Sequence, residues 1–181
     1  MTAILRQLPF LERENEVHVG SERVNIKPYQ IILWVSVTTR RILELPPGAP
    51  RFPVILDTAH NHNFSIQSNH LEQWAGVQAA ALPPRHRIRE RGRHASLHVA
   101  NLWIHRNRPG ERDAVSDEPP FLLPLEQGIV VYPRGIDFPR LPLLGLRALV
   151  QHKLHFTMDP ERCLVNLRRS DWRTKILTWL S

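Results

Sequence analysis

The sequence predicts a mostly β fold with one or two short helices. Apolar residues occur in short runs rich in β-branched side chains, as in residues 29–38, and such runs favour strands over helices. The 16 prolines lie mostly between these runs, where they interrupt regular structure. With 181 residues, 42% of them hydrophobic, the chain fits one domain with a sizeable core.

The first half of the chain contains three predicted strands and a short helix. Strands are expected at residues 29–38, 41–45 and 52–56, with a proline-rich turn at 46–50 and Asp57 directly after the third strand. A helix is expected over 69–75, because Ser68 can cap its start and Gly76 can end it.

The second half predicts further strands around another short helix. Residues 85–104 resemble two strands that bend near Gly92, and a polar loop covers 107–120. The remaining elements are strands at 121–125 and 128–132, a short helix at 146–153 after the apolar segment 141–145, and a hairpin formed by 154–157 and 163–167.

The two ends of the chain differ from this core. Residues 1–27 are mixed in character and are interpreted as an N-terminal arm, either amphipathic or poorly ordered. The core domain is expected to span 28–168. Residues 169–181 are expected to form a helical tail, with its apolar face supplied by Trp172, Ile176, Leu177 and Leu180.

Composition limits the chemistry and the compartment. Cys163 is the only cysteine, so neither an intramolecular disulfide nor a cysteine-based zinc site can form. The first ten residues lack the apolar core of a signal peptide, and no apolar run approaches the length of a membrane helix. A cytoplasmic protein without a membrane partner is therefore expected. The net charge of +7 is compatible with an acidic partner.

Two short motifs carry the strongest functional signal. Asp57-Thr58-Ala59 follows the apolar segment 53–56, and Leu143-Leu144-Gly145 leads into the predicted helix. Their order and separation resemble the retropepsin-like family of aspartic proteases, and the matching order of elements covers about residues 29–168. This resemblance implies a single-lobe, closed β-barrel domain.

The resemblance also implies a catalytic role for Asp57-Thr58-Ala59. In that family two carboxylates, one from each subunit, share a proton, because like charges held close together cannot both ionise cheaply. The ionised carboxylate activates water and the protonated one assists the scissile carbonyl. The expected protein is a homodimeric endopeptidase with Asp57 as the acid/base and Thr58 locking the two loops, acting on a peptide or protein substrate without a metal or other cofactor.

The hairpin around Gly92 is expected to be the flap that closes over substrate. Arg91, Gly92 and Arg93 would contact the substrate at its tip, and the two arginines would suit acidic or polar peptides. The chain departs from the family pattern at Ala59, where glycine is usual, and at His60, where a small residue is usual. A protonated His60 beside Asp57 would oppose proton sharing.

Other interpretations of these residues remain open. Asp57 could simply stabilise a turn at a strand end. His60, His62 and His70 could bind a divalent metal with Asp57. A catalytically silent binding or scaffold module would keep the same fold.

Nucleic-acid binding is a further alternative, with less support. Arg85, Arg87, Arg89, Arg91 and Arg93 alternate and would share one face of a strand, where they could contact phosphates. The same pattern is typical of a solvated edge strand.

Overall fold

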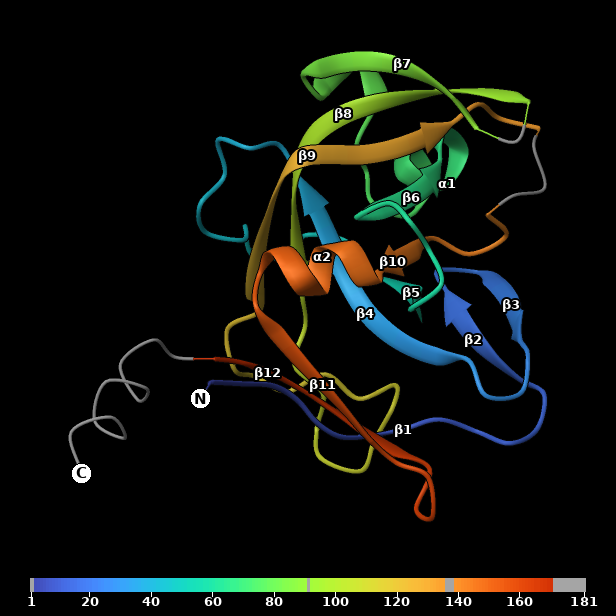
Figure 1. Ribbon diagram of the computed structural model, residues 1–181, viewed down its shortest axis with the longest axis vertical. Coiled ribbons are helices and arrows are strands. Elements are labelled where there is room, and N and C mark those ends of the chain that lie inside the picture. Colours follow the sequence, from blue (N-terminus) through green and yellow to red (C-terminus); the bar gives the residue numbers. More distant parts are fainter. Residues whose placement is uncertain (1, 91, 136–138, 171–181) are drawn as a thin grey trace.

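The protein is mostly β and contains a closed six-stranded barrel. A computed structural model describes residues 2–90, 92–135 and 139–170 (Figure 1), and 50% of the chain is strand and 9% helix. The mostly β barrel with two short helices predicted from the sequence is therefore confirmed. The predicted tail helix lies outside the described residues, apart from its first two positions.

The barrel closes through strands that are distant in sequence. Its hydrogen-bonded order is β4, β5, β10, β6, β9 and β8, and a β4–β8 pairing completes the ring. The bounds of these strands are β4 Ile31–Thr38, β5 Phe52–Asp57, β6 Phe64–Gln67, β8 Arg93–Ile104, β9 Phe121–Tyr132 and β10 Leu143–Gly145. All pairings are antiparallel except β5–β10 and β6–β9, which are parallel.

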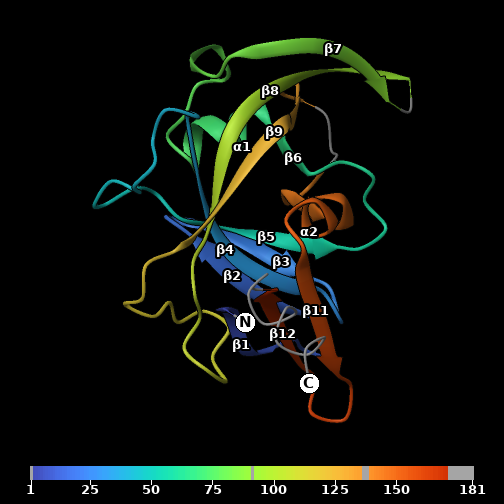
Figure 2. The ribbon, with the colours of Figure 1, turned by 60° about the vertical axis from the view of Figure 1, so that its left-hand side comes forward.

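A long hairpin extends from the barrel. Strand β7 (Pro84–Glu90) pairs with the first half of β8, and Glu90 lies opposite Arg93 at its end. The hairpin arches over β6 and α2 (Figures 1 and 2). This confirms the prediction of two strands that bend near Gly92.

The two α-helices of the described chain are each about one and a half turns long. Helix α1 (Ser68–Gln73) follows β6, and α2 (Leu146–Gln151) follows β10 directly. A 3-10 turn, η1 (Ala79–Ala81), precedes β7. Ser68 does not cap α1 as predicted; the cap position is Gln67 and Ser68 is the first helical residue.

The predicted strand at 41–45 is wrong. This segment is an irregular loop, and Leu43 is exposed. The side-chain amide of Asn101 donates hydrogen bonds to the carbonyl oxygens of Arg40 (3.3 Å) and Ile42 (2.7 Å). A side chain thus satisfies backbone groups that a neighbouring strand would otherwise bind.

Residues 1–27, expected to be an arm, contribute three strands to the fold. Strands β2 (Asn15–Val19) and β3 (Glu22–Ile26) form a hairpin whose inward side chains are buried in the main core. Strand β1 (Thr2–Pro9) forms a separate sheet with β12 (Leu164–Arg169) and β11 (Leu154–Asp159), in the order β1-β12-β11. The β11–β12 pairing confirms the predicted terminal hairpin.

Within the described ranges, no helix is both long and apolar enough to cross a membrane.

A half-buried histidine lies at the seam where the barrel closes. His105, just after β8, donates its backbone N–H to the Trp34 carbonyl (2.9 Å), and its Nε2 lies 2.8 Å from Ser36 Oγ. Because the Ser36 hydroxyl donates to the Pro50 carbonyl (2.7 Å), it accepts from His105 Nε2–H. Burial, with a smaller effect of the Arg51 charge, lowers the pKa of His105 from 6.5 to about 4.

This histidine should make the protein less stable in acid. Since the folded pKa of His105 is below the unfolded value, its contribution is complete above about pH 6.5 and is lost as the pH falls towards 4. Between pH 7 and pH 5, the free energy of unfolding should fall by about 1 kcal/mol more in the wild type than in His105→Gln, allowing for solvent screening. Urea unfolding at both pH values measures this. The exposed His155→Gln is the control, and an equal effect of the two variants would contradict the assignment.

Candidate functional site

Asp57 is the last residue of β5, which lies beside β10 and, beyond it, β6 in one sheet. Strand β10 lies parallel to β5, with Gly145 opposite Asp57, and antiparallel to β6, with Leu144 opposite Phe64. The connection from β5 to β6, residues 58–63, must therefore pass across the end of β10. The two sequence motifs are brought together, since one contains Asp57 and the other ends at Gly145.

Asp57 forms the first part of a tight turn. One carboxylate oxygen, Oδ1, accepts the backbone N–H of Ala59 (2.9 Å), and the Asp57 carbonyl accepts that of His60 (3.1 Å). The described part of the chain supplies no ion pair to Asp57 and no further hydrogen bond to its carboxylate. Asp57 is half-buried, and Thr58 and Ala59 are exposed. The second carboxylate oxygen therefore has no hydrogen-bond or ion-pair partner among the described residues.

Gly145 allows the 58–63 loop to lie against β10. Its backbone N–H donates to the Asn63 carbonyl (3.0 Å). A Cβ atom at Gly145 would lie 2.6 Å from the His60 carbonyl oxygen and closer still to that of His62. Gly145 has φ −91°, so glycine is needed here for space and not for a left-handed backbone.

His60 points into this loop. It is only 8% exposed, and its Nε2 lies 2.7 Å from the buried Ser65 Oγ on β6. The bulky His60 side chain is thus accommodated by packing against β6, inside the β5–β6 connection.

The flap residues named from the sequence are only partly described. Gly92 has φ +77°, which confirms that the bend uses its left-handed conformation. Arg91 lies outside the described residues, as does the side chain of Arg93. Their predicted contact with substrate stays a prediction.

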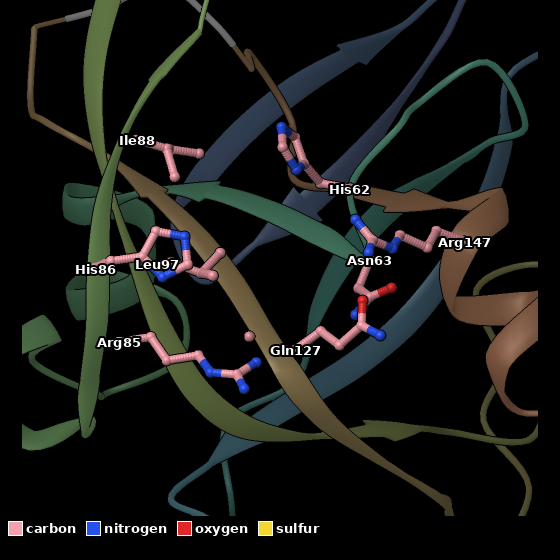
Figure 3. A pocket seen from close by; sticks show the side chains of 9 residues that line it. His62, Asn63, Arg85, His86, Ile88, Leu97, Gln127 and Arg147 are labelled. Atoms are coloured by element: carbon pink, nitrogen blue, oxygen red, sulfur yellow. The ribbon is translucent and has the colours of Figure 1, made fainter.

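A pocket of about 530 Å³ lies under the hairpin, against His62 and Asn63 of the 58–63 loop (Figure 3). Strands β7, β8 and β9, the 58–63 loop and helix α2 all contribute to its wall. Asp57, Thr58 and Ala59 do not line it. The lining residues are His62, Asn63, Arg85, His86, Ile88, Leu97, Gln127, Gly128 and Arg147.

The alternating arginines do not form the single face that the sequence predicts. Arg85 lines the pocket together with His86 and Ile88, whereas Arg87 lines a different pocket with His94 and Tyr132. The reason is an irregularity in the β7–β8 register between Pro84 and His86, which shifts the alternation after Arg85.

The three histidines proposed as metal ligands have different surroundings. The rings of His60 and His62 meet edge to face with centroids 5.5 Å apart, while His70 lies on α1 and stacks on Trp74 at 3.8 Å. Burial lowers the pKa of His70. Among the described residues, no three histidine, cysteine, aspartate or glutamate side chains are grouped closely enough to hold a metal ion.

Asn63, Gln127 and Arg147 line this pocket but received no functional role from the sequence motifs. Asn63 and Arg147 each lie close in sequence to a motif, six residues after Asp57 and two after Gly145. This closeness is a usable signal, because residues that follow the ends of two paired strands lie close together in space. Gln127 offers no such signal.

The comparisons with known proteins give no relative for this chain. No family model, no curated protein and no solved structure matches it.

Proposed function

We propose that the protein is an aspartic-type endopeptidase that acts as a homodimer, with Asp57 from each subunit at a shared site. The single observation that carries this proposal is the placement of Asp57. It lies in an exposed turn at the end of β5, opposite Gly145 of the parallel neighbour β10, with one carboxylate oxygen fixed by Ala59 N–H and the other without a partner in the described chain.

The geometry of the turn suits a carboxylate that must meet a second one. An oxygen held by a backbone N–H keeps the carboxylate in one orientation, which reduces the entropy lost when a partner binds. The exposed Thr58 and Ala59 leave the turn accessible to a second copy. Thr58 carries a hydroxyl that can donate and accept across a twofold axis.

The proposed reaction is a direct attack by water on a peptide carbonyl. The ionised carboxylate of the pair takes a proton from water while the protonated one donates to the carbonyl oxygen. The resulting tetrahedral intermediate collapses when the first carboxyl group passes the proton it took from water to the amine leaving group, while the hydroxyl proton returns to the second carboxylate and the C–N bond breaks. No covalent acyl-enzyme forms, and neither a nucleophilic side chain nor a metal is required.

Helix α2 offers an apolar surface close to Asp57 for the second subunit. Leu146 directly follows Gly145 and is 45% exposed, and Val150, one turn later, is 68% exposed. Residues four apart lie on one face of a helix. Burying these two side chains against a second copy would favour dimerisation.

Cleavage of unfolded proteins tests this proposal. We expect the purified protein, incubated with reduced, unfolded substrate proteins between pH 4 and pH 8, to generate defined internal fragments in the presence of EDTA. Mass spectrometry of the fragments measures this. Absence of cleavage by a protein shown to be dimeric would contradict the protease and favour a scaffold module. Cleavage that EDTA abolishes would indicate a metalloenzyme instead.

A further inference from the structure

The pocket under the β7–β8 hairpin is lined by basic and neutral residues, with no acidic side chain among the described lining residues. Arg85 on β7 and Arg147 on α2 reach into it from opposite sides (Figure 3), and His62 is a further lining residue. Arg85 donates to the Glu126 backbone carbonyl (2.8 Å). In the described chain, no carboxylate lies within ion-pair distance of either guanidinium.

Asn63 gives the pocket a buried hydrogen-bond acceptor without a donor among the described residues. Its side chain is 97% buried, since only 3% is exposed, and it lines the pocket. Its Oδ1 atom accepts no hydrogen bond from any described residue. A buried acceptor without a donor costs free energy, so a ligand N–H that reaches it would be favoured.

Together these groups fit a peptide with an acidic side chain. Two guanidinium groups that have no carboxylate partner among the described residues attract a carboxylate. The unpaired Asn63 oxygen accepts from an N–H, which a peptide backbone supplies and an inorganic anion does not. Ile88 and Leu97 give the pocket an apolar wall against which aliphatic carbons of Glu can pack.

We infer that this pocket binds an aspartate or glutamate side chain of a peptide. The inference rests on the proposed endopeptidase function for its biological meaning, because the pocket shares its wall with the Asp57 site. Asn63 also accepts the Gly145 N–H through its backbone carbonyl, and Gly145 lies opposite Asp57. A peptide whose acidic residue occupies the pocket would therefore lie against the loop that connects Asp57 to Asn63.

Binding of two matched peptides tests the inference without requiring cleavage. The probes are acetyl-Ala-Ala-Glu-Ala-Ala-amide and the same peptide with Gln, titrated into the ¹⁵N-labelled Asp57→Asn protein and followed by NMR. We expect the Glu peptide to bind about tenfold more tightly than the Gln peptide. Arg147→Gln and Arg85→Gln should each reduce this ratio towards one, whereas Arg23→Gln, which removes an exposed arginine on β3, should leave it unchanged.

Asn63→Ala provides a separate readout. It should weaken both peptides by a similar factor and leave the Glu/Gln ratio intact, because it removes an acceptor and not a charge. If either arginine variant fails to fold, the other one still tests the charge preference.

Several results would overturn the inference. These are equal affinity for the two peptides, no binding of either, an Arg23→Gln effect equal to that of Arg147→Gln, or inorganic phosphate binding as tightly as the Glu peptide. The last result would indicate a simple anion site. A retained Glu preference without cleavage by the wild-type protein would refute only the protease, and cleavage without that preference would refute only this inference.

Discussion

Replacing Gly145 by alanine is expected to destabilise the protein by more than about 3 kcal/mol. The added methyl group would collide with the backbone carbonyls of His60 and His62, and backbone atoms cannot move aside as a flexible side chain can. The variant must therefore displace the 58–63 loop or separate β10 from β5. Either change disturbs the turn that holds Asp57.

A second glycine provides the control for Gly145→Ala. Gly20 lies in the β2–β3 turn with φ +59° and with open space around its Cα, so Gly20→Ala should cost only about 1 kcal/mol of backbone strain. Urea unfolding monitored by circular dichroism measures both variants. A Gly145→Ala protein that is as stable as Gly20→Ala would show that the loop does not cross β10 as described.

Asp57→Asn is expected to reduce peptide cleavage by at least about a thousandfold while leaving stability nearly unchanged. A general acid or base contributes about 10²–10⁴-fold, and a homodimeric variant loses both carboxylates. Asn can still accept the Ala59 N–H through its side-chain oxygen, so the turn is retained. Asp117→Asn removes the charge of an exposed aspartate elsewhere and should cleave like the wild type.

Mixing wild-type and Asp57→Asn subunits extends this prediction to the dimer. If each active site needs both carboxylates, an equal mixture that has exchanged subunits retains about a quarter of the wild-type activity, because only that share of dimers is wild type in both halves. A mixture that retains half of the activity would indicate that each subunit works alone.

Local sequence patterns predicted the elements around Asp57 well. Nearby residues were enough to recognise the β-branched runs of β4 and β5, the Gly92 bend and the segment from Leu143 into α2. The two motifs singled out in the sequence lie side by side, because β5 pairs with β10 and Asp57 lies opposite Gly145.

The N-terminal strands could not be recognised so easily, for a reason visible in β1. Its pairing with β12 has two irregularities, and Gln7 has φ +47°. The buried residues Ile4, Leu5 and Leu8 therefore follow helical spacing although the segment is a strand. By contrast, β2 and β3 alternate regularly through Val17, Val19, Val24 and Ile26 around Gly20, which is a hairpin signal present in the sequence but missed.

The pocket could not be predicted because its members come from five separate segments. The change of face after Arg85 depends on a register irregularity between β7 and β8, and sequence spacing does not reveal it. The unpaired Asn63 oxygen likewise becomes visible only when its surroundings are known.

The distance between the two Asp57 carboxylates in a dimer decides whether they can share a proton. A crystal structure of the dimer measures it. The proposed endopeptidase requires the closest carboxylate oxygens to lie within hydrogen-bonding distance, about 2.5–3.2 Å, so that one proton is shared. A dimer in which these oxygens are more than about 6 Å apart would leave no shared proton and would contradict the account.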